Sequence, residues 1–216
     1  MTPTRRDPGP AELATRTQLS RPAAEVAPQL LDALLVSDLG PRVIVRVTEV
    51  EAYAGLGSDP ASHAHRRRTE RNSSLFGPVG HAYVYFTYGM HWCLNVVAHP
   101  EGTAGGALIR AGEVVTGVSA ARSRRTSARS DRDLARGPAR LAMALGVAGD
   151  QDGIDLLDPR SPLRLELRAV DAPMAIGVGP RTGIAGEGAD TPWRFWVDGD
   201  PTVSPYRRAA ARKSTR

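Results

Sequence analysis

The chain has 216 residues and a mass of 23.0 kDa, a length that fits one domain. Hydrophobic residues make up 41% and charged residues 24%, which suits a globule that buries a core. Its single cysteine, Cys93, excludes an intramolecular disulfide and with it a secreted disulfide scaffold.

One stretch without charged side chains raises the question of a membrane. Residues 77–100 contain no Asp, Glu, Lys or Arg. They are rich in Gly, Tyr, His and Asn, a composition that predicts a buried hairpin instead of a membrane span. The first 16 residues contain no apolar h-region, so we expect no signal peptide and a cytoplasmic protein.

Positive charge is concentrated in the segment 119–140. Seven arginines and two aspartates give it a net charge of +5, which equals the net charge of the whole chain. Such a stripe is typical of a phosphate-binding surface. The alternative is a solvated loop, because Lys213 is the only lysine and genomic base composition could account for the many arginines. Charge alone leaves both open.

The N-terminal half predicts one short helix followed by strands. Residues 1–16 are rich in proline and arginine, and we expect them to be disordered. After Pro28, leucines at 30, 31, 34 and 35 recur at helical spacing, which predicts a helix that ends at Gly40-Pro41. Residues 42–55 predict a strand, and residues 57–75 are polar and irregular.

The rest of the chain predicts paired strands, one helix and a glycine-rich loop. Residues 81–97 read as two strands joined near 88–90. A helix should begin near Pro138 and stop at Gly146. Adjacent strand pairs with few helices indicate one α+β domain at residues 17–206, followed by a basic tail at 207–216. Further strands are expected at 105–114, 154–158, 163–170 and 192–197, and the loop at 175–186.

Two glutamates lie at the end of the valine-rich strand. The face with Val43, Val45 and Val47 should also carry Glu51 and Tyr53. A carboxylate on that face either borders a cleft or is a costly buried charge. The alternative, which the residues alone favour, is that the strand end has left the core and both glutamates, at 49 and 51, are solvated.

Aromatic residues cluster in the middle of the chain, with seven of the eleven between residues 53 and 92. Tyr83 and Tyr85 point to one side of their strand, and Val84 and Phe86 point to the other. One strand face could therefore offer flat rings that stack on nucleic-acid bases. Ordinary core packing of the tyrosines is the alternative.

Neither a metal site nor a dinucleotide site is predicted. His63, His65, His91 and Cys93 match no standard zinc spacing, and the arginines at 66–68 would repel a cation. The glycine-rich loop lacks the GxGxxG spacing of a dinucleotide fingerprint. We expect neither a metal nor an organic cofactor.

Several motifs occur together in a specific order. EAY stands at residues 51–53, YVYxxYGMxxCxN at 83–95, LxRAxE at 108–113 and GPRTGIAG at 179–186, before the PWRFWV strand. Over residues 20–205 the chain resembles the alkyladenine (3-methyladenine) DNA glycosylase family. The resemblance implies a single domain around a curved, mainly antiparallel sheet with peripheral helices. It also implies a base-excision repair hydrolase that flips damaged purines out of duplex DNA.

The resemblance implies a role for three residues in the hydrolysis. Glu51 becomes the general base for the attacking water, Arg110 its electrostatic partner, and the carbonyl of Thr182 helps to hold the water. A bifunctional glycosylase would need an amine for a Schiff base. Because the only lysine, Lys213, lies in the tail, we expect a monofunctional enzyme.

The same resemblance implies the DNA contacts. Tyr53, His63 and Tyr85 line the base pocket, and Asn95 stands where the family crowds the exocyclic amine of guanine. Tyr88, with Met90 beside it, is the wedge that replaces the flipped nucleotide in the stack. The candidates for contacts with the DNA backbone are Arg71, Arg122, Arg124, Arg125 and Arg140.

The expected partner is damaged double-stranded DNA, bound by a monomer in the bacterial nucleoid and not at a membrane. The main alternative is a DNA- or RNA-binding module that uses the arginine stripe and the tyrosine face without catalysis. A second alternative is a related fold, appended to formyl-transfer enzymes, that handles RNA. The preferred lesion stays open among 3-methyladenine, 7-methylguanine, hypoxanthine and ethenoadenine.

Overall fold

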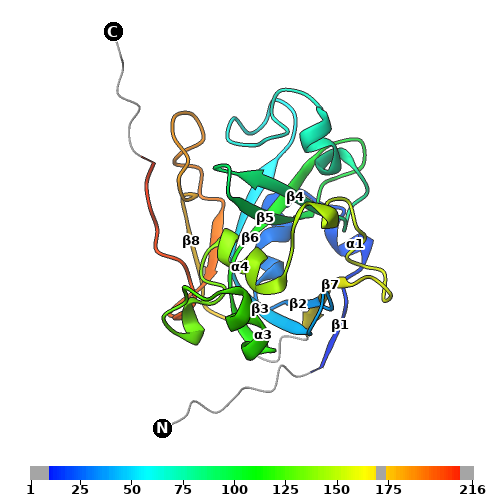
Figure 1. Cartoon of the computed structure of the whole chain (residues 1–216). Coiled ribbons are helices and arrows are strands. Elements are labelled where there is room, and N and C mark those ends of the chain that lie inside the picture. The colour runs from blue at the N-terminus through cyan, green and yellow to red at the C-terminus, as the bar shows by residue number, and fades with distance from the viewer. Residues whose placement is uncertain (1–9, 169–173, 210–216) are drawn as a thin grey trace.

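An antiparallel sheet runs through the whole protein (Figure 1). The computed structural model describes residues 10–168 and 174–209. The strand order is β1-β7-β2-β3-β6-β5-β4, and β9 joins β3 and carries β8 on its other side. The strands are β1 (Ala11–Leu13), β2 (Leu34–Ser37), β3 (Val43–Ala54), β4 (Ala82–Thr87), β5 (His91–Val97), β6 (Gly105–Thr116), β7 (Leu163–Arg168), β8 (Ile176–Gly179) and β9 (Arg194–Val197).

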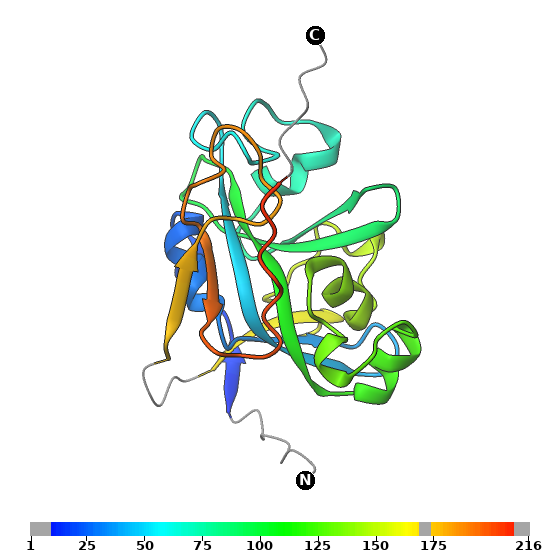
Figure 2. The same cartoon turned by 90° about the vertical axis from the view of Figure 1, so that its left-hand side faces the viewer.

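Short helices cover the sheet on both sides. Figure 2 shows α4 on one side of β3 and β6, and the N-terminal helices with β8 and β9 on the other. The prediction of one α+β domain built around a mainly antiparallel sheet is confirmed. The helices are α1 (Arg16–Leu19), α2 (Ala23–Val26), α3 (Val118–Arg124) and α4 (Pro138–Leu145), and the 3-10 turns are η1 (Ala27–Leu30), η2 (Glu70–Phe76), η3 (Asp131–Asp133) and η4 (Gly149–Gln151).

The helix α4 has the bounds that its sequence signals predict. Pro138 stands in its first turn, where the missing N–H costs no hydrogen bond. Gly146 ends it with φ at +77°, a left-handed value that glycine adopts without strain. Its apolar face packs into the core through Leu141, Ala142 and Leu145. The helix therefore forms a fixed wall beside β5 and β6.

The strand β3 changes faces part-way along its length. Val43, Val45 and Val47 belong to the core, but the next core residues are Val50 and Ala52. Register shifts against β6 on both sides of Glu49 mark a β-bulge that breaks the alternation. Glu49, Glu51 and Tyr53 therefore lie on the opposite face from the valines. The prediction that Glu51 and Tyr53 share the face of these valines is wrong, because the bulge shifts the alternation by one residue.

The β4–β5 hairpin is confirmed, with its turn at the predicted place. Tyr88 and Gly89 have φ of +52° and +67°, and the Met90 amide donates to the carbonyl of Thr87 at 3.2 Å. Two successive left-handed residues match the right-handed twist of the flanking strands. Glycine adopts this conformation freely, whereas it is uncommon and strained for tyrosine. Figure 2 shows the tip of the hairpin projecting beyond the sheet.

Three predictions of local structure are wrong. Leu34 and Leu35 lie in β2, because the chain turns at Asp32, whose φ is +67°, before the helical spacing can continue. Residues 154–158 form turns instead of a strand. One isolated β-bridge joins Asp155 to His81, the residue before β4. The glycine-rich loop begins with a strand, Ile176–Gly179, that pairs with β9.

The expected disorder at the N-terminus is wrong for part of its range. Ala11–Leu13 form β1, which pairs with β7, and α1 begins at Arg16. Residues 1–9 and 210–216 lie outside the described residues, so the remainder of both expected tails stays a prediction. Within the described ranges, no helix combines the length and the apolar character that crossing a membrane requires.

Candidate active site

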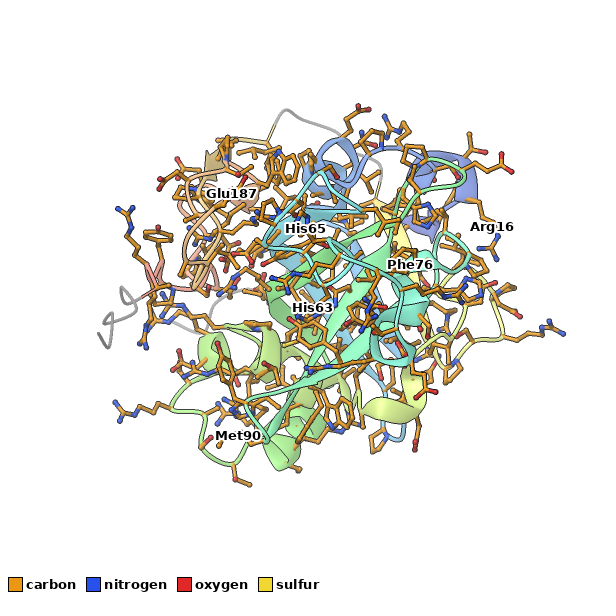
Figure 3. The ribbon with its side chains drawn as sticks, turned by 90° about the horizontal axis from the view of Figure 1, so that it is seen from above. Arg16, His63, His65, Phe76, Met90 and Glu187 are labelled. Atoms are coloured by element: carbon orange, nitrogen blue, oxygen red, sulfur yellow. The ribbon has the colours of Figure 1, made fainter. Side chains whose placement is uncertain are left out.

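A cavity of about 280 Å³ opens where β3, the β4–β5 hairpin and β6 meet two loops. Figure 3 looks onto this face, with His63 near its middle and Met90 at its rim. The sequence places the predicted pocket residues on five different segments of the chain, and the fold brings them together. Those that line the cavity are Tyr53, His63, Tyr85, Tyr88, Asn95, Arg110 and Thr182.

Glu51 is fully buried behind the cavity wall. Its carboxylate accepts a hydrogen bond from the Tyr53 hydroxyl at 2.8 Å and one from the Thr182 amide at 2.7 Å. The guanidinium Nη1 of Arg110 lies 3.3 Å from Glu51 Oε1. All three partners line the cavity, whereas Glu51 itself lies behind them. The expectation that both glutamates are solvated is wrong.

Donors that keep their protons surround this carboxylate. Burial, followed by the negative charge of Glu51, raises the pKa of Tyr53 well above its usual value, so its hydroxyl stays protonated. Burial alone would lower the pKa of Arg110, but the charges of Glu51 and Glu49 outweigh it and raise the pKa. Arg110 therefore carries its positive charge at pH 7.

The Thr182 amide reaches Glu51 because a buried ion pair holds its loop. Arg181 donates to both carboxylate oxygens of Asp59, at 2.6 and 2.8 Å, and to the carbonyl of Ala52 at 2.9 Å. Its guanidinium also lies 4.7 Å from the centre of the Tyr53 ring. Sequence reasoning missed this pair. The position of Arg181 next to Thr182 was the available signal, but its partner lies 122 residues away.

Aromatic rings form one side of the cavity. Tyr83 and Tyr85 stack at 5.3 Å between centroids, and His63 packs edge-on against Tyr85 at 4.6 Å. The Nδ1 atom of His63 lies 2.9 Å from the Tyr83 hydroxyl. Burial, assisted by the charge of Arg71, lowers the pKa of His63, so its ring is neutral at pH 7. The cavity thus offers uncharged ring faces and edges.

The floor of the cavity carries an amide. Asn95 is buried, and its Nδ2 donates to the carbonyl of Tyr83 at 3.0 Å. Its neighbour Cys93 also lines the cavity, and burial raises the pKa of that thiol, which keeps it neutral. A flat polar ring entering the cavity would therefore meet a fixed amide next to uncharged groups.

The tip of the β4–β5 hairpin is exposed. Tyr88 is 85% exposed and Met90 66%, although both are large and apolar. The alternative that Tyr88 packs in the core is therefore excluded. Behind the tip, Phe86 and Trp92 pack against each other at 4.8 Å and support the turn. Exposed apolar side chains on a supported turn are typical of a surface that inserts into a partner.

Comparison with known proteins places this arrangement in a family. The family described as methylpurine-DNA glycosylase (MPG) matches residues 17–201. The chain belongs to the methylpurine-DNA glycosylase family. Similar proteins that bear the name "putative 3-methyladenine DNA glycosylase" come from Streptomyces avermitilis, Nocardia farcinica and Leifsonia xyli. They are 54%, 52% and 51% identical to this chain, over 92%, 85% and 87% of its length and 94%, 86% and 89% of theirs.

In this methylpurine-DNA glycosylase family member, two of the predicted backbone-binding arginines are at least partly buried and are held by main-chain carbonyls. Arg124 donates to the carbonyls of Ala144 and Leu39, at 2.9 and 3.0 Å. Arg125 is buried and donates to the carbonyl of Leu134 at 3.2 Å. Arg124 thus ties α3 to the end of α4. Carbonyls already hold both side chains, and the expectation that they contact DNA phosphates stays a prediction.

The exposed arginines are better placed for an anion. Arg122 pairs with Asp131 at 2.8 Å, and Arg71 donates to the Phe86 carbonyl at 2.8 Å. Arg129 and Arg140 are exposed at a second cavity of about 530 Å³, which shares His91 and Ala139 with the first. Arg129 was not among the predicted contacts, because the run of arginines alone could not rank its members.

Histidine and cysteine near the cavity do not gather into a metal site. Across residues 10–168 and 174–209, no group of three or more His, Cys, Asp and Glu side chains could hold a metal ion. His63 contacts the Tyr83 hydroxyl, and Cys93 lies on β5 beneath Tyr85. Both residues belong to the wall of the aromatic cavity.

Proposed function

We propose that the protein hydrolyses the N-glycosidic bond of alkylated purines that have been flipped out of duplex DNA. The observation that carries the proposal is a buried carboxylate, Glu51, held by three residues that line an aromatic cavity of about 280 Å³. A binding module that only holds phosphates has no use for an anion at that position. The family and the names of the relatives support the same activity.

The aromatic wall suits a damaged base. A purine such as 3-methyladenine is cationic, so its glycosidic bond is already weakened and the base leaves without strong acid assistance. A cation is attracted to the faces of tyrosine rings, by about 0.5–2 kcal/mol. Tyr53 and Tyr85 supply such rings, and the neutral His63 does not repel the positive charge. The fixed amide of Asn95 would crowd the exocyclic amine of an undamaged guanine.

The carboxylate of Glu51 can activate the water molecule that attacks the sugar in place of the base. In the proposed reaction Glu51 takes a proton from the water and stabilises the oxocarbenium-like sugar. Thr182 borders the same place: its amide binds Glu51, and its buried Oγ1 makes no hydrogen bond within the described residues. We propose that this hydroxyl and the Thr182 carbonyl hold the water, while Arg110 fixes the charge on Glu51.

The test is a panel of duplexes that each carry one lesion. Free base is measured directly, and strand cleavage is measured in parallel. Release of a cationic alkylated purine without strand cleavage is the expected result, because the described cavity offers no lysine for a Schiff base. Tight binding to the lesion without release of any base would support the non-catalytic alternative. The relative rates for hypoxanthine and ethenoadenine would define the lesion range.

Tyr88→Ser is expected to lower excision from a paired lesion while the protein stays folded. The exposed ring would fill the gap left by the flipped nucleotide, offsetting an unstacking cost of a few kcal/mol. Excision opposite an abasic site should be affected less, because that base is easier to extrude. A similar loss on both substrates would contradict the wedge. Val178→Ser, at an exposed apolar position of β8 outside both cavities, is the matched control for lost apolar surface.

Arg129→Ala with Arg140→Ala is expected to flatten the dependence of DNA binding on salt. If both side chains contact phosphates beside the cavity, the slope of log K against log salt should change by up to ~1.8. The matched control is Arg160→Ala, an exposed arginine outside both cavities. An unchanged slope in the double variant would mean that the second cavity is not a phosphate site.

A further inference from the structure

The segment that follows β9 covers the polar face of β3. Figure 2 shows this segment, in red, running along the sheet. Thr202 Oγ1 lies 2.9 Å from Thr48 Oγ1 at the bulge, and the carbonyl of Val203 accepts from Arg136 at 2.8 Å. The carbonyl of Arg207 accepts from the amide of Gly183, next to Thr182, at 2.8 Å. The family match ends at residue 201, so these contacts lie outside it.

Ser204 is the point where this segment meets the charged groups. Its amide donates to Glu49 Oε2 at 2.7 Å, and its carbonyl accepts from Arg194 at 3.0 Å. Its hydroxyl lies 3.4 Å from Arg110 Nη2. Ser204, Glu49, Arg110 and Arg194 are all buried. One residue of the segment therefore contacts three charged side chains that water does not screen.

Glu49 holds the arginines more closely than Glu51 does. Arg194 Nε donates to Glu49 Oε1 at 2.6 Å, and Arg110 Nε donates to the same atom at 3.0 Å. The closest approach between Arg110 and Glu51 is 3.3 Å. The two negative charges of Glu49 and Glu51 thus match the two positive charges of Arg110 and Arg194. Arg110 contacts both carboxylates, and its contact with Glu49 is the shorter one.

We propose that Glu49 and Ser204 are positioning residues that hold Arg110 back from Glu51, so that Glu51 stays anionic and yet basic enough to take a proton from water. The proposal rests on the function proposed above. Glu51 is faced by Tyr53 on β3, Tyr85 on β4, Cys93 on β5, Arg110 on β6 and the Thr182 amide. Burial raises the pKa of Tyr85 and of Cys93, so of these five groups Arg110 alone carries a charge.

Two substitutions should move the basicity of Glu51 in opposite directions. In Glu49→Gln Arg110 is left with Glu51 as its only carboxylate partner of the two, so Glu51 should become a weaker base than in the wild type. In Arg194→Gln the carboxylate of Glu49 keeps only Arg110 as a cationic partner and draws it away, so Glu51 should become a stronger base. Loss of stability by itself predicts no such reversal of sign.

The experiment measures Glu51 directly and its effect on the reaction separately. The side-chain carboxyl of Glu51 is titrated by ¹³C NMR in the full-length protein, and single-turnover base release is followed against pH. In Glu49→Gln we expect the acid limb to move down by about one pH unit, with a plateau about threefold lower. Glu49→Asp keeps the negative charge, so its pH profile should lie close to that of the wild type.

Glu113→Gln is the matched control, because Glu113 lies on β6 but pairs with Arg46 at 2.8 Å instead of Arg110. It should leave the titration of Glu51 unchanged. An unchanged Glu51 titration in both Glu49→Gln and Arg194→Gln would overturn the proposal, whatever happens to stability. Opposite shifts in a protein that releases no base would support the positioning of Arg110 and refute the proposed function instead.

Discussion

Replacing Glu51 with glutamine is expected to lower single-turnover base release by ~10²–10⁴-fold. The carboxamide has nearly the same size and can still accept the hydrogen bond of the Thr182 amide, but it cannot take a proton from water. Because Glu51 is fully buried behind the wall and touches no exposed surface, binding to a lesion duplex should change little. Binding and base release are measured on the same duplex.

The control for Glu51→Gln is Glu113→Gln, which removes a carboxylate from the neighbouring strand at a partly exposed position. It should excise at the wild-type rate. Excision by Glu51→Gln within a few-fold of wild type would rule out Glu51 as the general base. Loss of binding together with excision would instead assign the carboxylate a role in holding the DNA.

Asp59→Asn is expected to destabilise the fold by about 3–5 kcal/mol, because it leaves Arg181 as a buried cation without its carboxylate. Both side chains are almost completely removed from water, so of the hydrogen-bond partners among the described residues only the carbonyls of Ala52 and Gly188 would remain for the charge. Urea unfolding monitored by tryptophan fluorescence measures the change. Excision should also fall in the folded fraction, because the loop that presents Thr182 to Glu51 loses its anchor.

The control for Asp59→Asn is Asp131→Asn, which breaks the surface pair with Arg122. Exposed pairs contribute little, so its unfolding midpoint should stay close to wild type. An equally small change in Asp59→Asn would show that the Arg181 pair is dispensable. In that case the main-chain contacts of Arg181 with Ala52 and Gly188 would have to hold the loop.

Periodicity predicted those parts of the fold in which each strand follows a plain alternation. The β4–β5 hairpin was predictable because Gly89 marks the turn between two alternating strands. The face of Glu51 was not, because a bulge is fixed by pairing with β6 and by the contact of Thr48 with Thr202, 154 residues away. A count along one strand contains no information about either partner.

The site was predictable where its residues lie in motifs, and not where distant partners decide. The motif around Glu51 and Tyr53 placed both beside the cavity, and the turn position of Tyr88 predicted its exposure. Arg124 looks like any other arginine of its run, yet the carbonyl of Leu39, 85 residues earlier, makes it a structural residue. Only the folded chain shows which arginines already bind partners within the protein.

The sequence separation of the contacts of Glu49 indicates at which stage of folding the site forms. Its partners Arg110, Arg194 and Ser204 lie 61, 145 and 155 residues further along the chain. Contacts of such separation form late, because large loops must close first, whereas the β4–β5 hairpin closes locally. Opening of the segment that carries Ser204 would remove its contacts with Glu49, Arg194 and Arg110 while the hairpin and its exposed tyrosine stay in place. If the proposed function holds, such a state would keep the exposed tip for DNA but lose part of the arrangement that the reaction at Glu51 needs.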